Sequence, residues 1–277
     1  MTTISQIIRG MPATDGAGVE LSRVIGQPAL PMLDPFLLLD VFRSDKPDDY
    51  IAGFPPHPHR GFETVTYLLE GRMRHKDNAG HEGVIESGGI QWMTAGKGIV
   101  HSEMPEQQHG LLEGFQLWVN LPAKHKMTEP TYQEFSSEQL PVERREGNVE
   151  VSVITGTTST GTQGPVNQPL TDPLYLDVKL PRGRTFVEPL NPEYNAFIYI
   201  IKGPLTVGDN GTRLDRDQLA VLNPGEELIV SSMDQDVRFI MIAGKPLNEP
   251  VERGGPFVMN SREEIDQAFA DYRGGKF

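Results

Sequence analysis

The sequence predicts an all-β fold: two tandem antiparallel β-barrels of jelly-roll type, with a short helix at the C-terminus. Three observations lead to this prediction. Glycine (29 residues) and proline (23) separate short segments rich in Val, Ile, Phe, Tyr and Thr, as expected of strands joined by tight turns. The chain contains an internal repeat of strand patterns. Only two segments suggest a helix.

The expected strands are short β-branched and aromatic runs, and several of them alternate between apolar and polar residues. Turn signals such as KDNAGHEG, ESGG, VGDNGT and LNPGEE lie between them. In chain order the strands are ETVTYLLE (63–70), GVIE (83–86), IQWMT (90–94), FQLWVNL (115–121), VEVSVITG (149–156), LYLDVKL (174–180), FIYIIKG (197–203) and LIVSS (228–232).

The helix predictions concern two segments. SSEQLPVE (136–143) can hold one short turn, whereas SREEIDQAFADYRGG (261–275) has a complete helix signature. In the latter, Ser261 caps the start, with Glu264 three positions on, and Gly274 ends the helix. Its apolar face, expected to pack on a sheet, comprises Ile265, Ala268, Phe269 and Tyr272.

The repeat relates the two halves of the chain at a spacing of about 130 residues. ETVTYLLEGRM (63–73) corresponds to NAFIYIIKGPL (195–205), and each is followed by a hairpin and a second strand. Between the halves, GTTSTGTQGPVNQP (156–169) is expected to form a loop that resists packing. The repeat predicts two similar β domains, 1–133 and 134–277.

Composition excludes several classes of function. The chain has no cysteine, so disulfides and thiolate chemistry are excluded and a metal must be held by histidine and carboxylate. A net charge of −13 disfavours nucleic acid as a partner. No secretory pattern or membrane-length apolar run occurs, which predicts a cytoplasmic protein without membrane contact. No phosphate-binding glycine loop or nucleophile elbow is present.

Two pairs of residues carry the functional prediction. His57 and His59 are two positions apart in extended structure, as are His101 and Glu103, so each pair projects to one face of its strand. Three imidazoles and one carboxylate suit a divalent first-row metal and leave coordination positions open. In the repeat alignment, the second half has none of these groups. The residues opposite are Pro189, Asn191, Ser231 and Met233.

Other candidate ligands remain ambiguous at this stage. Glu63 can be a ligand that competes with Glu103, a partner of a ligand, or a solvated strand residue. The other histidines lie in polar or turn contexts without a ligand partner on the same face, and we expect them on the surface or in hairpins. They are His75, His81, His109 and His125.

The segments HPHRGFETVTYLLEG and QWMTAGKGIVHSEMP resemble the two cupin motifs, and with LDPFLLLDVF, FQLWVNLP and GPFVMNSREEI they resemble the pirin family over nearly the whole chain. The resemblance implies a bicupin whose N-terminal domain holds Fe(II), with Mn, Ni, Co or Zn as possible substitutes, and whose C-terminal domain has no ligands. The implied ligands are His57, His59, His101 and Glu103, with Glu63 outside the set.

The resemblance also implies quercetin 2,3-dioxygenase activity: oxygen-dependent ring cleavage of a flavonol or other aromatic substrate, with Glu103 as the proton acceptor. Phe54, Met93 and Phe115 are candidates for the apolar groups that exclude water. An alternative that the resemblance implies is a non-enzymatic, iron-dependent redox sensor that acts through a regulatory protein partner. A third is another metal-dependent cupin reaction on an unknown substrate.

Overall fold

The computed structural model describes residues 2–277, which divide into two compact units. We call residues 11–32, 36–137 and 247–277 the histidine unit, and residues 2–10, 33–35 and 138–246 the second unit. Each unit consists of strands far apart in the sequence, because the chain passes between the units several times. Each unit therefore contains segments from both sides of the expected boundary between residues 133 and 134. The division into sequence domains 1–133 and 134–277 stays a prediction.

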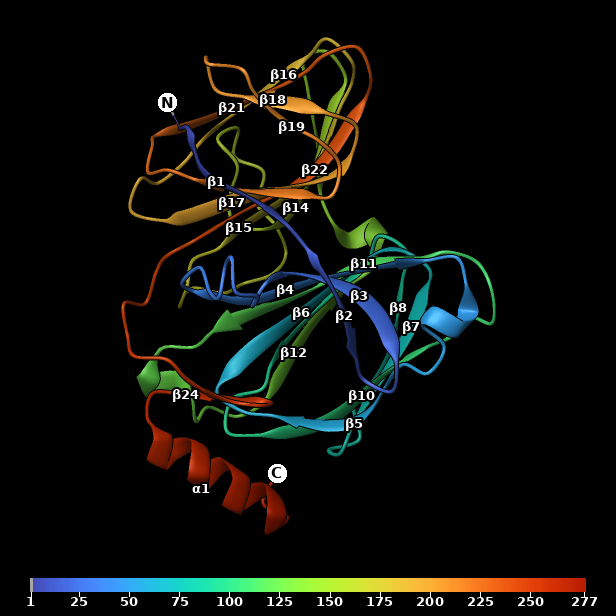
Figure 1. Ribbon diagram of the computed structural model, residues 1–277, viewed down its shortest axis with the longest axis vertical. Coiled ribbons are helices and arrows are strands. Elements are labelled where there is room, and N and C mark those ends of the chain that lie inside the picture. The colour runs from blue at the N-terminus through green and yellow to red at the C-terminus, as the bar shows by residue number, and fades with distance from the viewer. Residues whose placement is uncertain (1) are drawn as a thin grey trace. The chain divides into compact units, whose positions relative to one another are not determined.

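Within the described residues, the histidine unit contains a seven-stranded and a four-stranded antiparallel sheet (Figure 1). The order in the larger sheet is β12 (Thr131–Phe135), β9 (Ile90–Thr94), β6 (Phe62–Glu70), β11 (Leu112–Asn120), β4 (Phe36–Ser44), β3 (Val19–Ile25) and β2 (Met11–Asp15). The order in the smaller sheet is β5 (Phe54–His59), β10 (Ile99–Pro105), β7 (Arg72–Asp77) and β8 (Glu82–Glu86).

The second unit likewise has, among residues 2–277, one sheet of seven strands and one of four. The larger sheet runs β1 (Ile4–Arg9), β20 (Gln218–Leu222), β17 (Asn195–Lys202), β22 (Val237–Gly244), β15 (Leu174–Leu180), β14 (Val149–Thr155) and β13 (Val142–Arg145). The smaller runs β16 (Thr185–Pro189), β21 (Glu227–Ser232), β18 (Leu205–Val207) and β19 (Thr212–Leu214).

The two units have the same strand order, which confirms the predicted all-β bicupin-type duplication. In both, the four-stranded sheet begins with a strand paired to one about 40 residues further along, β5 with β10 and β16 with β21. The expected strands all occur within a few residues of their predicted bounds. In each unit the seven-stranded and four-stranded sheets stay separate, and strand pairing does not close them into a barrel over the described residues.

The interiors of the two units differ in polarity. The second unit contains a large apolar cluster, to which β16 and β21 contribute Phe186, Leu228 and Val230. In the histidine unit, β5 and β10 bring His59 and His101 inside instead, with 4% and 1% of their surface exposed. Among residues 2–277, all groups of three or more potential ligand side chains that lie close together belong to the histidine unit. Buried polar side chains need hydrogen-bond or metal partners, and the buried histidines are therefore the first candidates for a functional site.

The C-terminal segment completes the histidine unit. The helix α1 (Arg262–Arg273) begins at Ser261 and ends at Gly274, with the predicted capping box between Ser261 and Glu264. Ile265 and Ala268 are buried against Phe257 of β24 (Phe257–Met259), which pairs with β23 (Glu252–Gly254). Phe269 is partly buried in the same cluster, whereas Tyr272 is 39% exposed, so the predicted apolar face is confirmed for Ile265, Ala268 and Phe269 and not for Tyr272. No helix among residues 2–277 has the length and apolarity to cross a membrane.

Short 3-10 turns and loops complete the described chain. The turns are η1 (Pro47–Asp49), η2 (Ala123–His125) and η3 (Ser137–Gln139), and η3 confirms the predicted turn in SSEQLPVE. The loop 156–169 differs from expectation because it is held in place. Buried Thr158 donates to Glu143, and the backbone N–H of Ser159 donates to Glu188 over 2.7 Å. A side-chain hydroxyl and a backbone N–H of the loop thus bind carboxylates of β13 and β16, a possibility that composition alone does not reveal.

Candidate metal centre

Two adjacent strands bring three histidines together. β5 carries His57 and His59, and its antiparallel partner β10 carries His101 directly opposite His57. Alternation along β5 places both of its imidazoles on the inner face of the sheet, and the register brings His101 to the same face. The ring centroids of His57 lie 4.7 Å from those of His59 and 4.5 Å from those of His101, while the His59 and His101 rings are 5.1 Å apart. The H-x-H pattern therefore forms the cluster that the sequence predicts.

Hydrogen bonds determine which ring nitrogens face the cluster. His57 Nδ1 lies 2.8 Å from the carbonyl oxygen of Pro55, and His59 Nδ1 lies 3.4 Å from that of Pro256. Because a carbonyl only accepts, each Nδ1 carries the proton and each Nε2 is left with its lone pair. This orientation, in which the outer nitrogen binds a carbonyl, is the one that metal-binding histidines adopt.

The cluster has the geometry of a cation site. The two Nε2 atoms of His57 and His59 are 3.0 Å apart, with no proton available between the two lone pairs. Neither ring nitrogen of the buried His101 has a hydrogen-bond partner. A cation bound at about 2.1 Å to two nitrogens at right angles would hold them about 3.0 Å apart, which matches this spacing. The three imidazoles thus fit a divalent metal and are poorly satisfied without one.

The surroundings keep two of the imidazoles, those of His59 and His101, neutral. Burial lowers the pKa of His59 well below its usual value, and the nearby His57 lowers it further. Burial likewise lowers the pKa of His101, with His59 and His57 adding to the effect. A metal binds the neutral form of histidine, so these imidazoles need not lose a proton at neutral pH before they bind one.

Glu103 stands beside the three histidines but is held differently. Its side chain is 4% exposed, and Oε1 accepts a hydrogen bond of 2.9 Å from the hydroxyl of Thr66 on β6. Burial raises the pKa of Glu103, against the opposing effects of His57 and Thr66. The close group of ligand atoms consists of the three histidines, and whether Glu103 completes it stays a prediction. Glu63 is fully buried on β6 and accepts a bond of 2.6 Å from Thr94.

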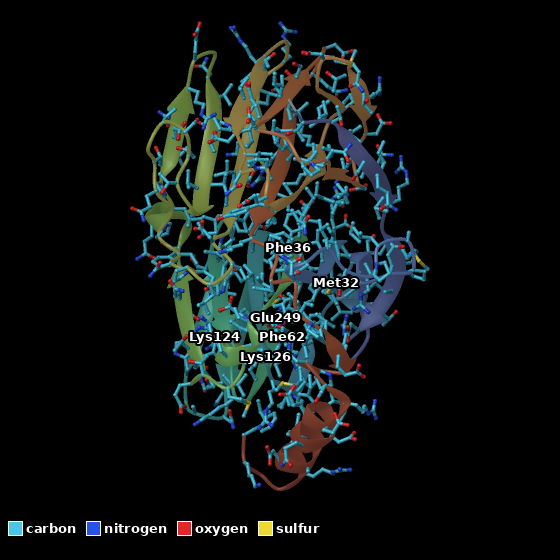
Figure 2. All side chains as sticks on the ribbon, turned by 90° about the vertical axis from the view of Figure 1, so that its left-hand side faces the viewer. Met32, Phe36, Phe62, Lys124, Lys126 and Glu249 are labelled. Carbon is cyan, nitrogen blue, oxygen red and sulfur yellow. The ribbon has the colours of Figure 1, made fainter. Side chains whose placement is uncertain are left out.

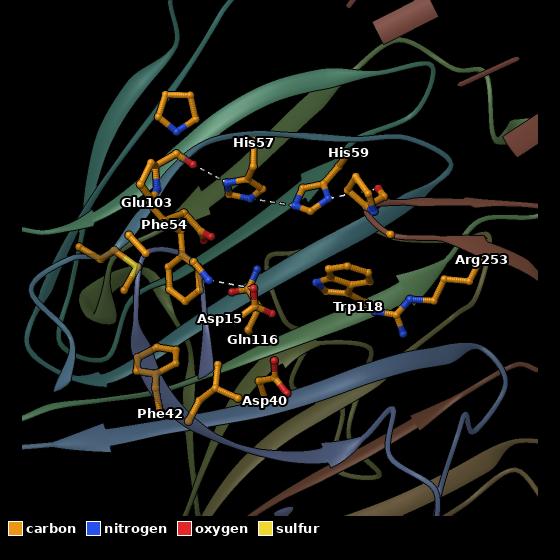
Figure 3. A pocket seen from close by; sticks show the side chains of 18 residues that line it. Asp15, Asp40, Phe42, Phe54, His57, His59, Glu103, Gln116, Trp118 and Arg253 are labelled. Atoms are coloured by element: carbon orange, nitrogen blue, oxygen red, sulfur yellow. Dashed lines mark hydrogen bonds between the residues drawn. The ribbon is translucent and has the colours of Figure 1, made fainter. Parts of the chain in front are cut away.

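A cavity of about 600 Å³ opens beside the histidines (Figure 3). His57, His59 and Glu103 form one wall, and Trp118 and Phe42 lie across from them in Figure 3. The remaining lining includes the apolar side chains of Phe54, Leu21 and Met73, and its polar groups are Gln116, Asp15, Asp40 and Arg253. A pocket of this size and polarity is typical of a small-molecule site.

The cavity corrects two of the three predicted apolar groups. Phe54 lines the cavity, whereas the buried Met93 packs against Ala95, Ile99 and Tyr132, and buried Phe115 is not among the lining residues. On β11 the lining residues are Gln116 and Trp118, two positions apart on one face, and Phe115 points to the other face. The alternation of FQLWVNL shows that Gln116 and Trp118 share the face opposite to that of Phe115. The sequence does not show which of the two faces meets the cavity.

Two of the histidines expected on the surface or in hairpins have a partner that the sequence analysis missed. His75 and His81 belong to the β7–β8 hairpin as expected, but His75 is only 1% exposed. Both imidazoles approach Glu134 of β12, which is more than 50 residues further along the chain. The expectation that they lack a ligand-type partner is wrong, because β12 joins the larger sheet beside β9 and faces the hairpin. His109 is exposed, as expected.

The paired units of seven- and four-stranded sheets, with H-x-H and H-x-E on adjacent strands of one unit, define a bicupin with a histidine site able to hold a metal. Comparisons with known proteins agree. The Pirin family matches residues 18–119, and the Pirin C-terminal cupin domain matches residues 175–277. The chain belongs to the pirin family.

Relatives resemble the chain over nearly its full length. A pirin-like protein of Caulobacter vibrioides is 53% identical over 99% of this chain and 98% of its own. A Pseudomonas aeruginosa protein provisionally named a quercetin 2,3-dioxygenase is 50% identical over 98% of this chain and 96% of its own. The crystal structure of quercetin 2,3-dioxygenase from Acinetobacter baumannii superposes with a TM-score of 0.91 at 33% identity, covering 100% of this chain and 98% of that one.

Proposed function

We propose that the chain is a metal-dependent dioxygenase that cleaves the heterocyclic ring of a flavonol, with Fe(II) held by His57, His59, His101 and Glu103. One observation carries the proposal: three imidazoles lie close together with two lone pairs 3.0 Å apart, and two of them, His57 and His59, line a cavity of about 600 Å³. The names of the Pseudomonas and Acinetobacter relatives support the substrate class. Bound Fe(II) would lower the pKa of the substrate 3-hydroxyl and bring dioxygen next to the ring.

Glu103 is suited to take the proton of the substrate hydroxyl. It lines the cavity, and burial raises the pKa of its carboxyl, which makes the carboxylate a better base than an exposed glutamate. The Thr66 hydroxyl, 2.9 Å from Oε1, holds the carboxylate in one orientation. A carboxylate that both contacts the metal and accepts a proton would couple substrate binding to activation.

The walls of the cavity orient the substrate and exclude water. Trp118, Phe42 and Phe54 offer flat apolar surfaces to aromatic rings. The Arg253 guanidinium, which also lines the cavity, lies 4.7 Å from the centroid of the Trp118 ring and packs over that ring. Exclusion of water protects reactive species until the ring opens to release carbon monoxide and leave a depside.

Oxygen uptake tests the proposal. The purified chain is loaded with Fe(II) without air, mixed with quercetin, and followed by oxygen consumption and carbon monoxide release. We expect equal molar amounts of both, with turnover reduced at least about 100-fold in His101→Ala, because one ligand is lost. His109→Ala, at an exposed histidine outside the site, is the matched control. Iron loading that leaves quercetin oxidation no faster than without iron would refute the activity.

A further inference from the structure

A second group of ligand-type side chains lies outside the site described above. His75 of β7, His81 at the end of the β7–β8 turn and Glu134 of β12 offer ligand atoms within 4.8 Å of one another. His75 Nε2 is 2.8 Å and His81 Nε2 is 3.1 Å from the same carboxylate oxygen, Oε1 of Glu134. Two neutral imidazoles and one carboxylate are the ligand set of many zinc sites, in which water or substrate takes the fourth position.

The surroundings hold both imidazoles in place. The ring of Tyr132 stacks on that of His81 with centroids 4.2 Å apart and planes at 27°, and its centroid lies 5.9 Å from that of His75 at 29°. Gly83 leaves the necessary space, because a Cβ at this position would come within 2.5 Å of His75 Nε2. Any larger residue would push the imidazole away from Glu134. The three rings and the glycine thus preorganise the group.

Hydrogen bonding alone does not satisfy this group. His75 is 1% exposed, and although its Nε2 is close to Glu134, neither of its ring nitrogens makes a well-directed hydrogen bond. A buried imidazole nitrogen that lies 2.8 Å from a carboxylate oxygen without a well-directed hydrogen bond to it leaves both atoms available to a shared cation. Such unsatisfied buried groups are rare in native proteins and indicate a missing partner.

The carboxylate is ready to bind a cation, and the site is open to solvent. Burial alone would raise the pKa of Glu134, but its contacts with His75, Gln91 and His81 lower it to about 2. Gln91 Nε2 donates to Oε1 over 2.6 Å and so orients the carboxylate. The side chains of His81 and Glu134 are 39% and 32% exposed, which gives an ion a path from solvent to the buried His75.

We propose that His75, His81 and Glu134 form a second divalent-metal site, suited to Zn²⁺ and separate from the His57–His59–His101 site. Ligands bound at about 2.0–2.2 Å in tetrahedral geometry lie about 3.3–3.6 Å apart, so shifts of less than 1 Å would complete the site. A bound ion would link the β7–β8 hairpin of the smaller sheet to β12 of the larger one. It would act as a structural cross-link of the histidine unit, independent of the reaction proposed for the other site.

Metal stoichiometry tests the proposal without any measurement of activity. The tag-free chain is stripped with a chelator and titrated with Zn²⁺, and bound metal is measured by calorimetry and by elemental analysis after gel filtration. We expect two equivalents for the wild type and one for His81→Ala, for Glu134→Gln and for His59→Ala. His109→Ala, a control at an exposed histidine, keeps two. Glu134→Gln preserves the shape of the side chain and removes its charge. It therefore tests the second site even if His81→Ala does not fold.

Thermal unfolding separates this proposal from that of the first site. In a His59→Ala background, Zn²⁺ is expected to raise the Tm, and addition of His81→Ala should abolish the shift. A wild type that binds one equivalent, lost in His59→Ala and unchanged in His81→Ala, would show that Glu134 only accepts hydrogen bonds and would overturn the second site. A wild type that binds one equivalent, lost in His81→Ala and unchanged in His59→Ala, would count against the proposed function and leave the second site standing.

Discussion

A buried lysine makes the stability of the histidine unit depend on pH in an unusual direction. Lys126 is 1% exposed and follows η2. Its ammonium donates to the carbonyl oxygens of Gly61 (2.8 Å) and Val258 (3.0 Å) and to Oδ1 of Asn120 (2.7 Å), and Figure 2 shows its position near Phe62. All three protons are used, and among residues 2–277 the acceptors are two carbonyl oxygens and an amide oxygen, with no carboxylate in direct contact.

The magnitude follows from the pKa. Burial lowers the pKa of Lys126 from 10.5 to about 8, against the opposing attraction of Glu249 and Glu264. Between these two values the unfolded chain binds more protons than the folded chain, so the free energy of unfolding rises with pH. Below pH 8 both states are protonated and the contribution is constant. Integration over this window gives a gain of about 2 kcal/mol between pH 7 and pH 9.5.

The assay compares the wild type with Lys126→Met in urea at both pH values. Both tryptophans of the chain, Trp92 and Trp118, lie in the histidine unit, so their fluorescence reports the unfolding of that unit. We expect the variant to be less stable at pH 7 by about 3 kcal/mol, since three acceptors lose their donor. The difference should widen by about 2 kcal/mol at pH 9.5.

The exposed neighbour Lys124 provides the control, because Lys124→Met should show no pH-dependent difference from the wild type (Figure 2). A wild-type advantage over Lys126→Met that stays constant or shrinks as the pH rises would refute the reasoning. The ammonium would then be as well stabilised inside the protein as in water.

Three further substitutions test other parts of the histidine unit. Thr66→Val removes the hydrogen bond to Glu103 and should weaken Fe(II) binding about 10-fold or more, measured by competition with a chelator; unchanged affinity would show that Glu103 needs no support. Gly61→Ala should destabilise the unit by more than about 2 kcal/mol in urea, because φ is +88° and a Cβ would lie 2.0 Å from the Val258 oxygen. Ile265→Ala should cost about 2–5 kcal/mol in the same assay, and a loss below 1 kcal/mol would mean that α1 contributes little to stability.

Local patterns predicted much of the fold and of the histidine cluster. H-x-H and H-x-E on strands specify which side chains share a face, and β5 and β10 pair so that His57 meets His101. The capping box of α1 is equally local, since Ser261 and Glu264 are three residues apart. The capping box and the shared face within each strand depend on short stretches of chain, whereas the cluster also needs the pairing of β5 with β10.

The features that the sequence did not predict depend on distant strands. Glu134 joins His75 and His81 only because β12 pairs with β9, a contact that no local pattern indicates. The choice of Trp118 over Phe115 for the cavity wall depends on which face of β11 meets the smaller sheet. Alternation shows which side chains of a strand share a face. The surface that this face packs against is set by strand pairing across the whole unit.

The interleaved course of the chain has a consequence for anyone who wishes to study the units in isolation. No single cut separates them. A fragment that ends near residue 133 would carry β1 without its partner β20, exposing a bare strand edge prone to association. The same fragment would lose Val258, an acceptor of Lys126, and Asp271, which pairs with the buried Arg60. Dissection therefore calls for a rearranged gene that joins the three segments of each unit.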